Sequence, residues 1–218
     1  MFRNFIKVAF RNITRHKVFS WINIIGLSVG LACSILIAMF VLDELSYDRF
    51  HERSDDIYRI ALRGTFQGDK LNGVSTGAPV GNIFKEEIPE IKNSVRLVNY
   101  YSDGATIKIR NNSFKEEDLF YTDSTFFDIF SFDLIKGDKS SILTTPYTIV
   151  LTESMAEKYF GTTNVVGKSL EIDDEEYTIT GVAEDCPGNS HFHYKLLASL
   201  VSLDVADSPY WLSNDFSY

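Results

Sequence analysis

The sequence predicts an α+β protein in which one long apolar helix precedes a mixed domain of short strands and helices. Residues 19–42 contain no charged residue in 24 positions. The acidic segment after them alternates between strand-like and helix-like patterns separated by turn signals. We therefore expect an amphipathic basic helix over residues 1–18, a transmembrane helix over residues 19–42 and an extracytoplasmic α+β domain over residues 43–218.

The apolar stretch is long enough to cross a bilayer. At 1.5 Å per residue it spans about 36 Å as a helix, against roughly 30 Å for the hydrocarbon core. A buried helix of a soluble domain is the first alternative. A cleaved signal peptide is the second, but its apolar region is shorter and ends at a small-residue cleavage site. A lipoprotein signal ending at Cys33 is the third, yet the residues after Cys33 stay apolar. We expect an uncleaved anchor.

The charges around this stretch predict its orientation. Of the 21 Lys and Arg residues, five lie before the apolar stretch and 16 after it, where all 30 Asp and Glu residues lie. Positive residues mark the cytoplasmic side of a membrane helix. We therefore expect a bacterial inner-membrane protein with a cytoplasmic N-terminus and a periplasmic main domain. The acidic balance also argues against nucleic acid as a partner.

The first 18 residues have the pattern of an amphipathic helix. Apolar and basic residues recur at helical spacing on opposite sides, and we expect such a helix to lie in the interface with anionic headgroups near its basic side. The alternative is a cytoplasmic extension of the membrane helix packed on protein. The lipid bilayer is the expected partner of Phe2, Arg3, Phe5, Ile6, Lys7, Phe10 and Arg11.

Small residues recur at a spacing of four within the apolar stretch. Gly26 and Gly30 form a G-x-x-x-G motif, and Ser34 continues the row. Such a face lets another helix approach closely in a membrane. The row predicts helix packing at Gly26, Gly30 and Ser34 and indicates that other membrane helices exist.

The outer segment contains several local signals. A helix is expected between Pro79 and Pro89, and Asp123 is expected to cap a short helix bearing Phe126, Phe127 and Phe130. Thr152 is a plausible N-cap of a further helix, and Gly161 fits the turn position that ends it. The remaining signals are strands, expected at residues 57–63, 95–101, 105–110, 113–121 and 147–151, and a hairpin of residues 169–173 and 176–182.

The sequence offers no convincing catalytic site and no cofactor site. It lacks the G-x-x-x-x-G-K-[ST] phosphate loop, so this chain should not hydrolyse ATP itself. His191 and His193 form the one cluster of ligand-like residues; a structural turn and a metal site both remain open for this pair. Cys33 and Cys186 lie in incompatible regions, so we expect no disulfide between them.

At this point several segments resemble one family, the permease subunits of MacB/FtsX-type ABC transporters, and in particular their MacB-like periplasmic core domain. The order and spacing of the motifs carry the resemblance, with IVLTESMAEKYFG followed by VVGKSLEI as the strongest part. The matching segments are residues 2–32, 43–51, 120–138, 149–161, 165–172 and 177–199.

The resemblance implies a mechanism. Permeases of this family work as dimers with a cytoplasmic ABC ATPase, and ATP-driven movement passes through the membrane helices to the outer domains, a process called mechanotransmission. It therefore implies a noncatalytic subunit, a homodimer or heterodimer, an ABC ATPase partner and, in some members, a periplasmic adaptor. The substrate and the cognate ATPase stay open.

The sequence departs from the family pattern in one respect. No second apolar stretch of membrane length follows residue 42, so we expect that the chain is a fragment without the later membrane helices. The alternative function is a sensor or binding module held by a single helix. A sensor needs a cytoplasmic output module, however, and only 18 residues precede the apolar stretch.

Overall fold

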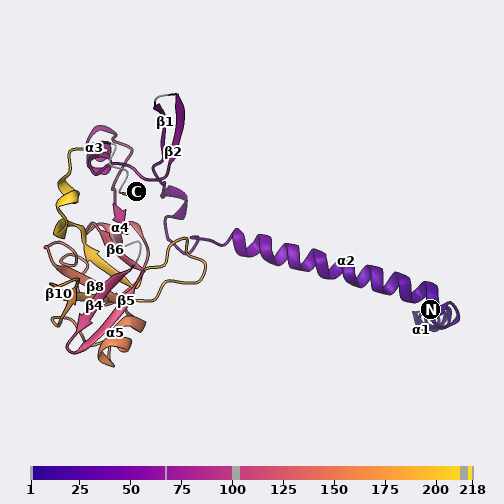
Figure 1. Ribbon diagram of the computed structural model, residues 1–218. Coiled ribbons are helices and arrows are strands. Elements are labelled where there is room, and N and C mark those ends of the chain that lie inside the picture. The colour runs from indigo at the N-terminus through magenta and orange to yellow at the C-terminus, as the bar shows by residue number, and fades with distance from the viewer. Residues whose placement is uncertain (1, 67, 100–103, 212–215, 218) are drawn as a thin grey trace. The chain divides into compact units, whose positions relative to one another are not determined.

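The computed structural model describes residues 2–66, 68–99, 104–211 and 216–217. Two compact units make up the chain, Met1–Tyr47 and Asp48–Tyr218. The first unit is helical, and the second combines a large sheet with short helices (Figure 1). The α+β class predicted from the sequence is therefore confirmed.

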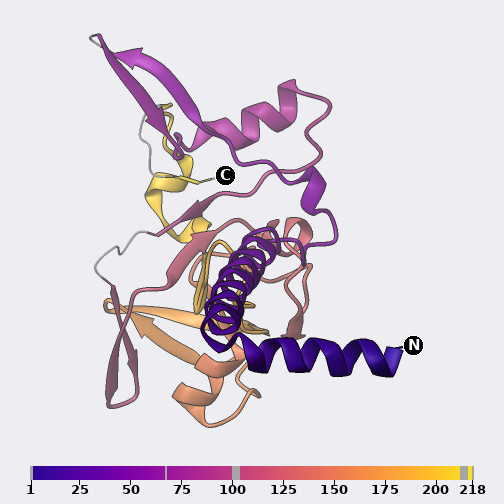
Figure 2. The same ribbon diagram turned by 90° about the vertical axis from the view of Figure 1, so that its right-hand side faces the viewer.

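The first unit consists of α1 (Phe2–Arg15) and α2 (Lys17–Glu44). The helix α2 has 28 residues, is long and apolar enough to cross a membrane, and has no residue buried within the chain. His16 separates the helices, because its backbone (φ −113°, ψ 58°) leaves the helical region. In Figure 2, α1 is seen from the side while α2 is seen nearly along its axis, so the chain bends sharply at His16.

A nine-stranded mixed sheet forms the centre of the second unit. β10 pairs in parallel with β8, β11 pairs in parallel with β6, and the other neighbours are antiparallel. β7 (Leu134–Lys136) pairs with β10 beside this path. The order along the sheet is β3 (Leu97–Val98), β6 (Leu119–Thr122), β11 (Leu196–Ser199), β8 (Thr148–Thr152), β10 (Glu175–Ala183), β9 (Ser169–Ile172), β4 (Ala105–Ile109) and β5 (Asn112–Glu116).

The burial of each strand follows its sequence pattern. All five residues of β8 are buried, as expected of a central strand covered on both faces, whereas β4 alternates buried and half-buried residues. β9 and β10 form the predicted hairpin. Its acidic turn places Asp173 and Asp174 at φ 47° and 76°, a left-handed conformation that Asp tolerates better than most residues.

Three α-helices accompany the sheet: α3 (Pro79–Glu87), α4 (Phe126–Ile129) and α5 (Glu153–Phe160). Thr152 is the N-cap residue of α5, although its side chain makes no capping hydrogen bond. Gly161 ends α5 with φ 69°, and its N–H donates to the Glu157 carbonyl at 2.8 Å. That φ is unfavourable for residues with a Cβ, which explains a glycine at this position.

A second, two-stranded sheet pairs β1 (Leu62–Phe66) with β2 (Asp69–Gly73). The strand expected over residues 57–63 is wrong in its position, because the strand β1 starts only at Leu62. Pairing with β2 begins opposite Gly73, and the chain beyond β2 bonds elsewhere: Thr76 exchanges backbone hydrogen bonds with Phe216. Residues 57–61 therefore have no strand to pair with. Short 3₁₀ turns lie at Ser54–Asp56, η2 (Leu200–Ser202) and η3 (Asp204–Asp207).

The expected strand over residues 95–101 is present only as β3, and Tyr100 and Tyr101 lie outside the described residues. β3 extends the sheet by pairing with residues near the other end of the chain. Leu97 and Ser217 exchange two backbone hydrogen bonds of 2.8 Å. Phe216, the residue before, is fully buried in the core.

Two clusters of buried side chains make up the hydrophobic core. The first lies between the sheet and α5 and includes Ile107, Ile149, Leu151, Met155 and Ile179. The second is rich in aromatic rings and includes Phe126, Phe127, Phe132 and Tyr194. We call the second cluster the aromatic core.

The expected capping role of Asp123 is wrong. Its carboxylate instead binds Arg96: Oδ1 accepts from Nη2 at 2.7 Å, and Oδ2 accepts from Nε and from the Arg96 backbone N–H, each at 2.9 Å. A guanidinium presents a planar pair of donors that fits both carboxylate oxygens, and this bidentate arrangement outcompetes a cap. Asp123 contributes only its carbonyl to α4, as acceptor from the Phe126 N–H at 3.1 Å.

The Arg96 side chain is 8% exposed and contacts several distant segments. Nη1 donates to the Ala206 carbonyl at 2.7 Å, and the guanidinium carbon lies 5.7 Å from the centre of the Phe216 ring. The charge therefore holds η3 and the segment at Phe216 against β3.

We expect Arg96→Ala to lower the free energy of unfolding by about 3 kcal/mol, because it leaves the half-buried Asp123 carboxylate without its cation. Urea unfolding of the full chain in detergent, followed by fluorescence, measures the change. Lys108→Ala is the matched control, since its ion pair with Asp174 is exposed and should contribute about 0–1 kcal/mol. Equal losses in the two variants would contradict the central role of Arg96.

Candidate functional site

The most specific polar arrangement of the second unit lies at its start, in residues 48–52. This segment follows α2 directly in the chain after Leu45–Tyr47. We call residues 48–52, together with residues 129–132 and 186–193 that they contact, the junction site. Its residues come from three separate parts of the sequence.

Asp48 binds the loop before β11 through both its backbone and its side chain. Its N–H donates to the Asn189 carbonyl at 2.9 Å. Its carboxylate accepts the His191 N–H at 2.9 Å and lies 2.6 Å from His191 Nδ1. The backbone of Asp48 has φ 55°, a left-handed conformation that Asp adopts more readily than most residues. The structure thus fixes Asp48 by at least three hydrogen bonds.

His51 and Glu52 bind a second loop, the one after α4. Ser131 supplies both partners: its N–H donates to His51 Nδ1 at 3.1 Å, and its Oγ accepts the Glu52 N–H at 2.9 Å. Because Nδ1 accepts a hydrogen bond, a neutral His51 carries its proton on Nε2. Nε2 is buried without a hydrogen-bond partner in the described structure.

The rings of Phe50 and His51 extend the aromatic core. The centre of the Phe50 ring lies 5.5 Å from that of Phe132, and the His51 ring lies 5.3 Å from both Phe130 and Phe132. His51 is 4% exposed. Burial lowers the pKa of His51, and the nearby Asp48 charge opposes this shift in part. The junction site therefore favours an uncharged imidazole packed among rings.

The arrangement holds a chain segment in place and does not resemble a reaction centre. Of the two histidines singled out in the sequence, His191 pairs with Asp48. His193 is exposed. In the part of the chain that the structure describes, no group of three or more His, Cys, Asp or Glu residues could hold a metal ion.

Cys186, at the edge of the same loop, is half-buried and reduced. Its Sγ accepts the Tyr194 N–H at 3.4 Å. Burial raises the pKa of the Cys186 thiol to about 11. Because the thiolate is the nucleophilic form, this burial favours the less reactive, protonated thiol.

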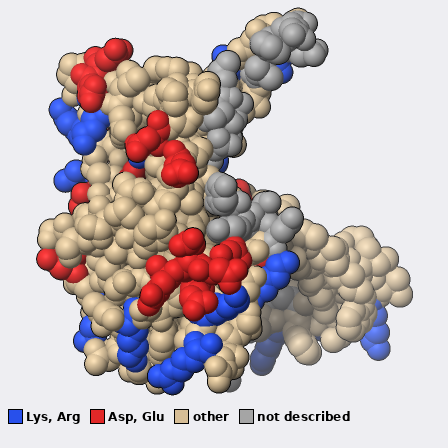
Figure 3. All heavy atoms as spheres, turned by 60° about the vertical axis from the view of Figure 1, so that its left-hand side comes forward, with Lys and Arg blue, Asp and Glu red and all other residues tan. Residues whose placement is uncertain are grey.

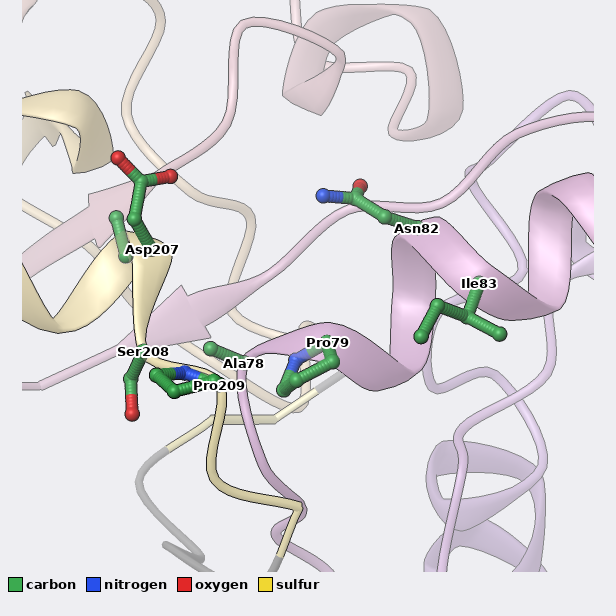
Figure 4. Close-up of a pocket in the computed structure, with 8 residues that line it drawn as sticks. Ala78, Pro79, Asn82, Ile83, Asp207, Ser208 and Pro209 are labelled. Atoms are coloured by element: carbon green, nitrogen blue, oxygen red, sulfur yellow. The ribbon is translucent and has the colours of Figure 1, made fainter.

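A shallow cleft of about 300 Å³ lies elsewhere in the second unit, between the start of α3 and the end of η3 (Figure 4). Asn82 from α3, Asp207 from η3 and Ser208 after it supply its polar side chains, and Pro79 and Pro209 also line it. Its volume is at the lower end of small-molecule sites. Among the described residues, the lining holds one carboxylate, Asp207, and one hydroxyl group, Ser208, so the cleft offers polar contacts for binding. The lining residues are Ala78, Pro79, Asn82, Ile83, Ala206, Asp207, Ser208 and Pro209.

The surface of the second unit carries both signs of charge. On the face shown in Figure 3, acidic side chains gather beside lysine and arginine side chains. Ion pairs such as Lys108–Asp174 and Lys195–Asp118 join the two signs. This face therefore lacks the single-sign field that attracts nucleic acid or other highly charged partners.

The residues predicted for membrane contacts lie in the first unit. A Cβ added at Gly26 or Gly30 would meet no atom within 4 Å, and Ser34 Oγ donates to the Gly30 carbonyl at 2.9 Å within the same helix. Ile6, Lys7, Phe10 and Arg11 of α1 are exposed, whereas the side chains of Phe2, Arg3 and Phe5 lie outside the described residues. Helix packing and interfacial binding stay predictions for these residues.

Sequence reasoning did not find the junction site. Asp48, His51 and Ser131 are separated from their partners by about 80 to 143 positions, and no local periodicity links such residues. The one local feature that marks this segment is the polar run after the apolar helix, in which Asp48 follows Tyr47 and His51 follows Phe50.

The fold is that of an α+β domain that follows an N-terminal apolar helix. The family model described as the MacB-like periplasmic core domain matches residues 20–212. The chain belongs to this family. No curated protein sequence matches it closely enough to count as a relative.

Solved structures with a similar fold include two from bacterial proteins. A domain that its description assigns to a permease protein from Porphyromonas gingivalis is 26% identical, with a TM-score of 0.59 over 67% of this chain and 68% of that one. The periplasmic region of MacB from Actinobacillus actinomycetemcomitans is 16% identical, with a TM-score of 0.52 over 76% of this chain and 77% of that one. The MacB-like resemblance read from the sequence is thereby confirmed.

The burial of His51 predicts a pH dependence. A folded-state pKa below that of the unfolded chain means that the unfolded state binds more protons as pH falls below about 6.5, so the free energy of unfolding should decrease from there. The slope due to one group is at most about 1.4 kcal/mol per pH unit. We expect His51→Gln to reduce this slope in urea titrations at pH 7.5 to 5.5 of the full chain in detergent. His193→Gln, at an exposed position, should retain it; an unchanged slope in His51→Gln would contradict the assignment.

Proposed function

We propose that this chain is part of a noncatalytic membrane subunit of a MacB/FtsX-type ABC transporter, and that it couples ATP hydrolysis by a partner ATPase to movement of its periplasmic domain. Membership of the MacB-like periplasmic core domain family supports the proposal most directly. The permease described among the similar structures supports it further. The processes served are export or other work in the cell envelope.

The junction site gives this proposal a physical basis. A movement of α2 reaches the second unit along the chain, through residues 45–47, and enters it at residues 48–52. There Asp48 and His51 are each bound to a different loop. One loop follows α4 and the other precedes β11. A segment fastened at two places transmits displacement to the sheet and does not absorb it by local unfolding.

The proposed membrane arrangement follows from charge and length. Residues 1–18 lie at the cytoplasmic surface, residues 19–42 cross the inner membrane, and residues 43–218 lie in the periplasm. All five basic residues before the helix lie on the proposed inner side, and the first acid is Asp43. The positive-inside rule favours this orientation.

A dimer of permease subunits, as a homodimer or a heterodimer, completes the proposal. The row of Gly26, Gly30 and Ser34 supports it, because no atom of the described residues lies within 4 Å of a Cβ added at either glycine. Close helix approach at such a row is typical of membrane assemblies. A periplasmic adaptor and a cytoplasmic ABC ATPase are the further partners that we propose.

Purification of the protein from its native membranes tests the function. We expect an ABC ATPase to co-purify in mild detergent, and we expect ATP to change the fluorescence of a dye attached to Ser140→Cys in a background in which both native cysteines are replaced, Cys33→Ala and Cys186→Ser. Asp48→Ala should reduce that change while the ATPase stays bound, because it removes the carboxylate that holds His191. Asp174→Ala is the control, since it removes an exposed ion pair away from the junction.

Two results would contradict this proposal. A protein that never associates with an ABC ATPase would remove the proposed class of function. An ATP response that is the same in Asp48→Ala and in the wild type would retain the class but remove the junction as the route of coupling.

Helix assembly yields a separate prediction. Gly26→Leu and Gly30→Leu should each weaken assembly by steric exclusion, measured by recovery of an untagged copy with a tagged copy from mixed membranes. Ala32→Leu is the matched control, because successive residues rotate by about 100° and place Ala32 on the opposite side of the helix. If both glycine variants recover the untagged copy as well as the wild type does, the proposed packing face is wrong.

A further inference from the structure

The bend between α1 and α2 encloses a hollow that the proposed function does not use. It has a volume of about 370 Å³ and is open to the surroundings on the side away from the helices. The last turns of α1 supply two of its residues and the first two turns of α2 supply the rest. We call this hollow the corner site, lined by Ile13, Thr14, Lys17, Ser20, Trp21 and Ile24.

The corner exists because the helix breaks at His16. The backbone of His16 is not helical, so α1 turns away from the axis of α2 instead of continuing it. The α2 residues of the corner follow one another at positions 17, 20, 21 and 24. This spacing places them on one face of a helix, the face turned toward α1.

The chemistry of the corner combines a cation, hydroxyl groups and apolar side chains. Lys17 supplies an ammonium, and Ser20 supplies a hydroxyl group that is free to donate in the described structure. Thr14 Oγ1 lies within hydrogen-bond distance of the Phe10 and Arg11 carbonyls, which leaves its oxygen able to accept a hydrogen bond. Ile13 and Ile24 make the remaining wall apolar.

The charges around the corner have one sign. The sequence before Asp43 contains five Lys and Arg residues and no acid. No carboxylate of this unit can therefore neutralise Lys17 from α1 or from the first six turns of α2. An anion that enters the corner meets a positive field as well as a specific ammonium.

We propose that the corner site binds an anionic phospholipid, with its headgroup phosphate at Lys17 and Ser20 and the start of its acyl chains against Ile13, Ile24 and Trp21. An ammonium with neighbouring hydroxyl groups suits a phosphate diester, and basic pockets beside membrane helices on the cytoplasmic side bind such headgroups. The indole of Trp21 suits the interface between headgroups and hydrocarbon. The proposal rests on the membrane placement of α2 given above and not on the partner ATPase.

Fluorescence of Trp21 tests the site. The chain has two tryptophans, so Trp211→Phe leaves Trp21 as the only source of indole emission. The full chain is placed in phosphatidylcholine vesicles that contain a minor fraction of either brominated phosphatidylglycerol or brominated phosphatidylcholine. Bromine quenches indole at contact. We expect brominated phosphatidylglycerol to quench as if it were enriched about fivefold next to Trp21, the effect of one basic residue near an anionic lipid.

Charge variants separate the corner from general attraction. Lys17→Gln should abolish the enrichment, and Lys17→Arg should retain it, which excludes misfolding as the cause of the loss. Lys7→Gln is the matched control, because it removes the same charge from α1 but does not line the corner. We expect Lys7→Gln to retain most of the enrichment.

Three results would overturn the proposal. Equal quenching by the two brominated lipids would show that the corner does not select an anionic lipid. Equal losses in Lys7→Gln and Lys17→Gln would show attraction by the whole helix without a site. Weak quenching by both lipids would show that protein fills the corner. Failure of an ATPase to co-purify would remove the proposed function and leave this result standing, so the two failures are distinguishable.

Discussion

One buried cation, Arg96, joins parts of the second unit that are remote in sequence. Its guanidinium binds Asp123 beyond β6 and the Ala206 carbonyl in η3, and it lies over the ring of Phe216. A buried charge without partners costs several kcal/mol. An arrangement that separates these segments leaves Arg96 or Asp123 unpaired. The pairing of Arg96 therefore favours the fold in which they come together around β3.

The junction site binds the start of the second unit to loops of the same sheet. The loop that holds His51 follows α4, which comes after β6, and the loop that holds Asp48 leads into β11. β6 and β11 are neighbours in the sheet and run in parallel. One attachment lies in the chain between β6 and β7 and the other lies just before β11, and Asp123, bound to Arg96, directly follows β6. In the proposed mechanism, a displacement of residues 48–52 would act on the part of the sheet that contains these strands.

Sequence reasoning succeeded where a local pattern decides the structure. The helix at Pro79 and the hairpin of β9 and β10 follow from turn residues and periodicity within one element. β2, β7 and β11 were missed. β11 is a fully buried run of four residues, which periodicity alone does not assign. Asp123 was misread as a cap because its partner Arg96 lies 27 positions away. Asp48 and His51 depend on still longer separations, which the pattern of one chain segment does not contain.

The side chains with shifted pKa values in the second unit suit the proposed role in transmitting movement better than a catalytic role. Burial raises the pKa of Tyr177 and Tyr194, raises that of Cys186 and lowers that of His51. In each case the uncharged form is favoured, and three of these residues border or belong to the aromatic core. A catalytic site needs perturbed groups that face a cleft with a partner able to take or give a proton. Here the cleft beside α3 contains none of them. The burial that shifts these groups reflects close packing where the chain enters the domain, and such packing suits the proposed transmission of movement from α2.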